Sequence, residues 1–400
     1  MDRETLVRRN RAMAEAMHKA PLKHLVRRVG LRAVSAVPIQ PVTPAERSRI
    51  LLIRPDHLGD VLLATPAMRA LRALRPNAEI HALVGPWSAA VLETCDAVDQ
   101  VLTIPFPGFS RAPNPNLRSP YELAWDTGRK LRLLRYSAAL ILRPDHWWGA
   151  LVAWLAGIPV RVGYALPDVD PFLTNRVPYE PIHAVVQNAR LIERLTGATL
   201  GEANLPLRYT VTDDDRAWMN GYLSEYELRS DDRLIALHAG AGTMVKLWEP
   251  QRWATVADRL ARQSSAKVVL TGSEAEIPLT RAIASHMTET PIVMAGDTQI
   301  GTLAALLERS ALAVGPDSGP LHLAVAVGTP TVALFGPADP NEFRPWGPPM
   351  RHLVLTTDIG CRPCRILDWS GDSSENHPCV REISIERVVE AGHRVLNAVS

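Results

Sequence analysis

Two series of alternating strands and helices, one in each half of the chain, constrain the fold more than any other feature of the sequence. In the first series, short apolar runs occur at residues 49–54, 79–84, 101–104 and 138–142. In the second series, they occur at residues 234–238, 267–270, 292–294, 311–314 and 331–335. Continuous apolar runs are typical of strands buried on both faces of a parallel sheet, and parallel strands need crossover connections. We therefore predict an α/β protein with two doubly wound parallel sheets.

The length of 400 residues also favours two domains, because a typical domain has about 100–200 residues. We predict a basic arm and linker at residues 1–47 and a first Rossmann-like domain at residues 48–207, in which a helix at 183–195 ends at Gly197. A connecting segment at 208–232 includes a polar helix. A second Rossmann-like domain follows at residues 233–380, and we expect a last helix at 381–400 to pack back on the first domain.

The composition is that of an ordinary globular protein, with 46% hydrophobic and 22% charged residues. The net charge of +2 argues against a nucleic-acid-binding protein. The most apolar stretch, residues 147–160, is shorter than the ~20 residues that span a bilayer, so no transmembrane helix is predicted. Four cysteines make no disulfide scaffold in a chain of this length and fit a reducing cytoplasm. We expect a cytoplasmic monomer.

Positive charge is concentrated in the arm. Residues 1–40 contain nine Arg or Lys against three acidic residues. One interpretation is attraction to the anionic cytoplasmic face of the inner membrane, which would make the protein peripheral there. The alternative is an accessory N-terminal extension without that role.

The first strand ends in the sequence RPDHLGD, residues 54–60, which leads directly into a helix. Ligands bind at the carboxyl ends of parallel strands, so this loop is a candidate site. Asp60 would act there as a general base if its carboxylate reaches a substrate hydroxyl. The alternative is that Asp60 caps the helix, as aspartates often do.

The fourth strand ends in the same four letters, RPDH, at residues 143–146. If both loops bind a ligand, their arginines supply positive charge suited to an anionic acceptor. The alternative is a coincidence in which Asp56 and Asp145 cap their helices. The residues that we assign to an acceptor site are Arg54, His57, Gly59, Arg143 and Asp145.

In the second domain, the first strand is followed by the loop HAGAGTMVK, residues 238–246. Gly240 and Gly242 allow the backbone to approach a ligand closely, and Lys246 adds a mobile cation, which together favour a diphosphate site over an ordinary turn. The next strand ends in TGSEAEI, residues 271–277. Its acidic residues either complement the helix dipole or hold ribose hydroxyls.

The strongest local pattern is the sequence DSGPLHLA, residues 317–324, which follows a buried strand. It brings Asp317, Ser318 and Gly319 to a turn, and a proline then opens a short apolar helix. The N–H groups at such a helix start favour an anion. His322 lies in the first turn of this helix, where the alternative is an ordinary core histidine.

These patterns together resemble glycosyltransferase family 9, the heptosyltransferases of bacterial lipopolysaccharide cores. The matching segments are GD at 59–60, KLWEP at 246–250, RWA at 252–254, DSGPLHLA at 317–324, GTPT at 328–331 and FGP at 335–337. The resemblance covers roughly residues 48–390. It implies the GT-B fold, in which two Rossmann-like domains face each other across a cleft. It also implies an inverting transfer of a heptose or related sugar from an ADP-sugar to a lipopolysaccharide-core or other cell-envelope acceptor.

The resemblance implies a role for each matching residue. Asp60 would deprotonate the acceptor hydroxyl. The donor-binding residues would be Gly240, Gly242, Thr243, Lys246, Glu276, Asp317, Ser318, Gly319 and His322. Within this set, Lys246 and the glycine loop would hold the diphosphate, Glu276 the ribose and Asp317 the sugar hydroxyls. Such enzymes need no divalent metal or other cofactor, and the Asp168-Val-Asp170 sequence lies in the other domain from the donor loop.

The tail departs from this pattern with Cys361, Cys364, His377 and Cys379. These residue types could bind zinc, but a thiol cluster is the favoured interpretation because a second CxxC or HxxxH is missing. Two alternatives in function also remain. One is a GT-B enzyme that uses a different nucleotide sugar, including an epimerase. The other is a non-catalytic protein that binds a nucleotide sugar. The loops at 106–120 and 164–178, where an acceptor would bind, do not reveal its identity.

Overall fold

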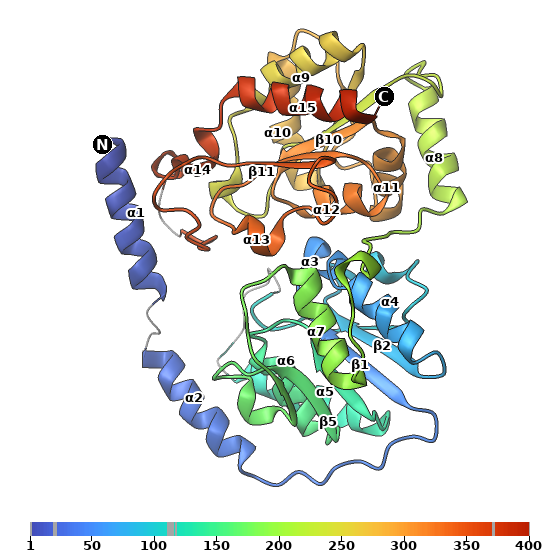
Figure 1. Cartoon of the computed structure of the whole chain (residues 1–400), viewed down its shortest axis with the longest axis vertical. Helices are drawn as coiled ribbons and strands as arrows, with labels where there is room; N and C mark the ends of the chain where they lie inside the picture. Colours follow the sequence, from blue (N-terminus) through green and yellow to red (C-terminus); the bar gives the residue numbers. More distant parts are fainter. Residues whose placement is uncertain (1, 19–21, 110–115, 117, 370–372, 400) are drawn as a thin grey trace. The chain divides into compact units, whose positions relative to one another are not determined.

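The computed structural model describes residues 2–18, 22–109, 116, 118–369 and 373–399. The chain divides into two compact units (Figure 1). The first unit is residues 20–206, and the second is residues 1–19 together with 207–400. The basic arm is therefore shared between the units rather than forming a separate segment.

The first unit contains a six-stranded parallel sheet with the order β3-β2-β1-β4-β5-β6. Its strands are β1 (Arg49–Arg54), β2 (Glu79–Val84), β3 (Gln100–Thr103), β4 (Ala138–Ile141), β5 (Val160–Tyr164) and β6 (Asn175–Val177). Its α-helices are α2 (Leu22–Ser35), α3 (Leu58–Leu62), α4 (Thr65–Leu74), α5 (Ser119–Leu133), α6 (Trp147–Leu155) and α7 (Ala184–Thr196). Helix α4 pairs with α7, and α5 pairs with α6. Helix α7 ends, as predicted, at Gly197, whose φ of 77° favours glycine.

The second unit contains another six-stranded parallel sheet, with the order β12-β11-β10-β7-β8-β9. Its strands are β7 (Leu234–His238), β8 (Lys267–Thr271), β9 (Ile292–Val293), β10 (Leu312–Pro316), β11 (Thr331–Leu334) and β12 (His352–Leu355). Its α-helices are α1 (Arg3–His18), α8 (Asp213–Ser224), α9 (Pro250–Ser264), α10 (Ile277–His286), α11 (Ile300–Arg309), α12 (Gly319–Ala326), α13 (Pro340–Phe343), α14 (Pro378–Arg381) and α15 (Ile385–Val399). The predicted class, an α/β protein with two parallel sheets, is confirmed.

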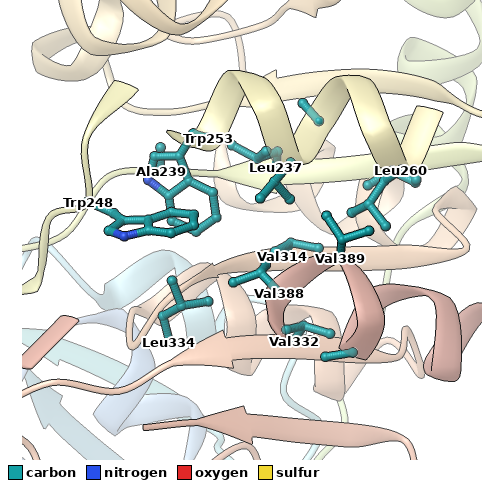
Figure 2. Close-up of a cluster of buried hydrophobic side chains, with 14 of the residues drawn as sticks. Leu237, Ala239, Trp248, Trp253, Leu260, Val314, Val332, Leu334, Val388 and Val389 are labelled. Carbon is teal, nitrogen blue, oxygen red and sulfur yellow. The ribbon is translucent and has the colours of Figure 1, made fainter. Parts of the chain in front are cut away.

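The last helix corrects a prediction. We expected residues 381–400 to pack on the first domain, but α15 packs on α9 and on β10, β11 and β12 of the second unit. Figure 2 shows Val388 and Val389 of α15 in the same buried cluster as Leu237, Val314 and Val332 of the strands. Burial of this apolar face stabilises α15 on its own sheet.

The same core contains two tryptophans that follow β7. The rings of Trp248 and Trp253 are 4.9 Å apart and nearly perpendicular (Figure 2). This edge-to-face arrangement suits the quadrupoles of the two rings. Since Lys246 immediately precedes this buried pair, the packing fixes the chain next to one candidate site residue.

The two arm helices dock on different units. In α1, Asn10 is buried and its side-chain amide donates to the carbonyl of Asn376, 2.7 Å away. In α2, Leu31 is buried in the core of the first unit, and Arg27 and Arg28 both contact Asp168. Among the described residues, no helix is both long and apolar enough to cross a membrane.

Close packing at Gly315 of β10 gives a test of the second sheet. An added Cβ there would lie 2.3 Å from the carbonyl oxygen of His238, a backbone atom of the neighbouring β7. We expect Gly315→Ala to lower the free energy of unfolding by about 1–3 kcal/mol, because the paired strands would have to move apart to accommodate the methyl group. Urea denaturation measures this change.

Gly221 in helix α8 of the same unit provides the matched control. A Cβ there meets nothing within 4 Å. Gly221→Ala should therefore raise the free energy of unfolding by roughly 0.5–1 kcal/mol through helix propensity. Equal effects of the two substitutions would contradict the packing described for β7 and β10.

Candidate active site

Both sheets have their topological switch point between the first strand and the fourth. In the first unit these strands are β1 and β4, and in the second unit they are β7 and β10. The loops that leave two such strands diverge to opposite faces of the sheet, which leaves room for a ligand at the carboxyl edge. Most candidate residues fall in these loops or in the first turn of the helices that follow them, whereas Glu276 follows β8.

Asp60 lies at the start of α3 but does not cap it. The N-cap position is occupied by His57, which makes no side-chain capping bond. The Asp60 Oδ1 atom instead lies 3.2 Å from Nη2 of Arg54, and the Asp60 side chain is 36% exposed. The carboxylate therefore has an ionic partner that orients it and is still accessible at the switch point.

Arg54 is 4% exposed, so it is not a surface contact for an acceptor. Its Nε lies 2.7 Å from Oδ2 of Asp56, and its Nη1 donates to the carbonyl of Leu142, 2.8 Å away. With the contact to Asp60, this guanidinium connects the end of β1 to the residue after β4. The geometry makes Arg54 a positioning residue for Asp60.

Asp56 joins the two RPDH loops. It is 2% exposed and forms ion pairs with Arg54, at the end of β1, and with Arg143, from the loop after β4. Burial alone would raise the pKa of Asp56, but the charges of Arg54 and Arg143 outweigh it and hold the pKa below its usual value. Arg143 also contacts Asp145, with Nε 2.6 Å from Oδ1. Asp56 and Asp145 therefore bind arginines, and the N-cap positions belong to His57 and His146.

Trp87 is a further member of this site that the sequence did not reveal. It follows β2, and its Nε1 donates to the carbonyl oxygens of Pro55 and Asp56, at 3.2 and 3.1 Å. Its ring lies 5.5 Å from that of His57. The indole thus holds the loop between β1 and α3, and only the tertiary fold brings it there.

A pocket of about 510 Å³ opens next to Arg143. Its lining residues are His24, Arg27, Arg28, Pro107, Phe109, Arg143, Asp145, His146, Trp147, Trp148, Leu166, Pro167, Asp168 and Val169. We call this the arm pocket, because three of its residues come from α2. Arg28 Nε lies 2.7 Å from Asp168 Oδ1, and Arg27 contacts the other oxygen of the same carboxylate. Asp168, considered above as part of an Asp-x-Asp sequence, here anchors two arginines.

Individual polar atoms of two arm-pocket residues are buried without a hydrogen-bond partner. Both ring nitrogens of His146 and the Nε of Arg27 lack a hydrogen bond. Burial lowers the pKa of His146 to about 3, so its ring is neutral at pH 7 and has one donor and one acceptor. Buried polar groups are nearly always paired, so these atoms can take a hydrogen bond from or give one to a further polar group.

In the second unit, the structure brings Lys246 and Asp317 together. Lys246 follows β7, Asp317 follows β10, and the ammonium nitrogen lies 2.6 Å from Asp317 Oδ2. It also donates to the carbonyl of Asp317, 3.2 Å away. Asp317 is buried and the Lys246 side chain nearly so. The ion pair fixes the lysine beside the start of α12.

The start of α12 has no side-chain cap. Ser318 occupies the N-cap position and makes no capping bond, Pro320 has no N–H, and the N–H of Leu321 donates to the carbonyl of Ser318, so the N–H of Gly319 is the one in the first turn that can face a ligand. The buried atoms Ser318 Oγ, His322 Nδ1 and Thr243 Oγ1 also lack protein partners. Burial lowers the pKa of His322 to about 4, which makes this imidazole neutral at pH 7. Several hydrogen-bonding groups thus gather where an anion is favoured.

Glu276 lies against the glycine loop. A Cβ at Gly240 would be 1.7 Å from Glu276 Oε1, so a larger residue there would displace the Glu276 carboxylate. The other oxygen, Oε2, accepts from the backbone N and the Oγ of Ser273, at 2.7 and 2.9 Å. Glu276 therefore has a capping function, and one oxygen is directed toward the loop after β7. By contrast, a Cβ at Gly242 would meet nothing within 4 Å.

The cysteines of the tail gather beside Asn10 of α1. Cys361, Cys364, His377 and Cys379 line one small cavity together with Trp369 and residues that include Asn10 of α1. Burial raises the pKa of all three thiols, that of Cys379 to about 12. Within the part of the chain that the structure describes, no group of three or more His, Cys, Asp or Glu is arranged to hold a metal ion.

Comparisons with known proteins agree with this architecture. Residues 124–368 match the family description "Glycosyltransferase family 9 (heptosyltransferase)". Lipopolysaccharide heptosyltransferase 2 of Salmonella typhimurium is 25% identical over 377 residues, which cover 87% of this chain and 99% of that protein.

Two solved structures share the fold. A family 9 glycosyltransferase from Veillonella parvula matches with a TM-score of 0.75 and 24% identity, over 89% of this chain and 100% of that one. The ADP-heptose lipopolysaccharide heptosyltransferase II of E. coli matches with a TM-score of 0.69 and 22% identity, over 88% of this chain and 99% of that one. The predicted GT-B fold class is thereby confirmed. Because the family match covers more than half of the chain, this protein belongs to glycosyltransferase family 9 and is a glycosyltransferase.

Proposed function

We propose that this chain transfers a heptose from an ADP-heptose donor to an anionic lipopolysaccharide-core or other cell-envelope glycan, with inversion at the anomeric carbon. The names of its relatives support this choice, since they include lipopolysaccharide heptosyltransferases and an ADP-heptose enzyme. Membership of a glycosyltransferase family favours transfer over the alternatives of an epimerase or a non-catalytic binding protein. The acceptor is attached to a membrane lipid, and the basic arm makes peripheral contact with that membrane.

The observation that supports this mechanism best is the accessible, oriented carboxylate of Asp60. Arg54 fixes its direction through the 3.2 Å contact, and Arg54 is itself held by the buried Asp56. Asp60 takes the proton of the acceptor hydroxyl while that oxygen attacks the anomeric carbon. The C–O bond to ADP breaks on the opposite face, so a single displacement inverts the configuration.

The donor is held by the second unit. Lys246 and the N–H of Gly319 at the start of α12 stabilise the negative charge that develops on the leaving diphosphate. Asp317 positions Lys246 and contacts sugar hydroxyls, and neutral His322 and Ser318 complete the donor contacts. Glu276 holds the ribose with the oxygen that faces Gly240. These fixed charges take the place of a divalent cation, so transfer in excess EDTA should continue at the same rate.

The acceptor is held by the first unit. Arg143 lines the arm pocket and contacts Asp56 in the loop that leads to Asp60, and Arg27 and Arg28 also line the pocket. The neutral ring of His146 and the unpaired Nε of Arg27 suit a hydroxyl-rich ligand with an acidic group. The pocket therefore accommodates an anionic sugar of the acceptor.

The role of Asp60 is tested by Asp60→Asn. Without the base, the rate of heptose transfer should fall by about 10²–10⁴-fold. The affinity for ADP, measured by calorimetry, should not change, because the nucleotide contacts lie in the second unit. Asp96→Asn is the control, since Asp96 is an aspartate of the same unit with an 85% exposed side chain. Turnover of Asp60→Asn near that of the control would rule out Asp60 as the base.

The role of Lys246 is tested by Lys246→Met, which removes the charge and keeps the alkyl chain. A lost charge-assisted hydrogen bond is worth roughly 1.5–3 kcal/mol, so the dissociation constant for ADP should rise about 10- to 100-fold. Lys267→Met, at an exposed position of the same unit, is the control and should leave the dissociation constant for ADP unchanged. Unchanged ADP binding in Lys246→Met would contradict the diphosphate site. Competition with UDP-sugars in the same titration tests the choice of nucleotide.

The arm pocket is tested by Arg28→Gln. With a water-soluble core oligosaccharide as acceptor, we expect KM for the acceptor to rise about tenfold, the effect of one lost charged hydrogen bond. The affinity for ADP should stay the same. Arg32→Gln, at an exposed position of the same helix outside the pocket, is the matched control. If both variants show wild-type KM values, the acceptor does not bind in the arm pocket.

A further inference from the structure

Helix α2 has an apolar stripe on its outer side. Leu25, Val26 and Val29 are 55%, 64% and 63% exposed, and Ala33 is also exposed. At 3.6 residues per turn, these four positions fall within an arc of roughly 100°. An apolar arc of that width is typical of a helix face that packs against another apolar surface. We call these four residues the α2 stripe.

The opposite side of α2 holds the helix in this orientation. Leu31 is buried in the core of the first unit, and Arg27 and Arg28 contact the carboxylate of Asp168. The Arg27 guanidinium also lies 5.4 Å from the centre of the Trp147 ring. Turning the α2 stripe inward would break all of these contacts. The apolar side of the helix is therefore fixed outward, the reverse of an ordinary surface helix.

The charge of α2 selects among surfaces that could cover the stripe. The helix sequence LKHLVRRVGLRAVS contains four basic residues and no acidic one, but Arg27 and Arg28 are paired with Asp168. Arg32 is exposed and lies next to the stripe on the helix surface. Basic residues that flank an apolar stripe are typical of helices that lie in the interface of an anionic bilayer. Two copies of this helix would instead bring like charges together, which disfavours self-association.

We propose that the α2 stripe inserts into the interface of an anionic lipid bilayer while the inner side of the same helix lines the arm pocket. The benefit of this anchoring rests on the proposed function, because an acceptor attached to a membrane lipid would then reach the arm pocket at the membrane surface. The stripe anchors the enzyme, and the residues of the reaction are elsewhere.

Vesicle flotation of the purified full chain tests this surface. The probes are vesicles of equal parts phosphatidylglycerol and phosphatidylcholine, and vesicles of phosphatidylcholine alone. The wild-type protein should float with the anionic vesicles, and binding should weaken as salt screens the basic residues. The variant Leu25→Ser, Val26→Ser, Val29→Ser should bind at least tenfold more weakly. Since these side chains are exposed, its fold should be unchanged, which circular dichroism and ADP binding verify.

Leu133→Ser is the matched control, because Leu133 is an 81% exposed apolar residue of the same unit outside the arm. It should float like the wild-type protein. On a water-soluble acceptor the stripe variant should keep wild-type turnover, so a failure of the membrane surface is distinguishable from a failure of the proposed reaction. Three outcomes would overturn the proposal. The first is that the wild-type protein does not float with anionic vesicles. The second is that the stripe variant floats as well as the wild type. The third is that the wild-type protein and the Leu133→Ser control sediment as dimers whereas the stripe variant does not.

Discussion

The candidate site of the first unit depends on one buried carboxylate. Asp56 lies between Arg54, the last residue of β1, and Arg143, from the loop after the neighbouring strand β4. A buried ion pair has a large desolvation cost, so each member needs the others, and removing one typically costs about 3–5 kcal/mol. Arg54 directs Asp60, and Arg143 lines the arm pocket. A single interaction therefore positions both the proposed base and one wall of the proposed acceptor site.

The second unit has a related arrangement at its own switch point. Lys246 comes from the loop after the first strand and Asp317 from the loop after the fourth, and their ion pair joins the two loops. The charge that would face a diphosphate is thus fixed before any ligand binds. Preorganised charge of this kind is effective because little reorganisation is needed when negative charge develops. Neutral His322 beside the pair adds hydrogen bonding without a second positive charge.

The sequence predicted those parts that depend on local pattern. Strands β1, β2 and β7 occur at the predicted residues, because their apolar runs are continuous. Strands β5, β6 and β12 were not predicted. The edge strand β6 is only three residues long and includes the exposed Arg176, so it has no apolar run to recognise. The meeting of Lys246 with Asp317 follows from strand ends at one edge of a sheet. The roles of Asp56, Trp87 and His146 cannot be predicted in this way, because they depend on contacts between distant loops.

Helix α2 shows why the arm could not be interpreted from charge alone. Its basic residues suggested attraction to a membrane, yet Arg27 and Arg28 are turned inward to Asp168. The outward side carries the α2 stripe instead. Helix α9 shows the usual distribution, with Trp253 and Leu260 buried and Gln251 exposed. A helix that served only to close the arm pocket would have an outer side like that of α9. The exposed apolar residues of α2 therefore favour contact with a second surface, and the positive charge of Arg32 beside them favours an anionic surface.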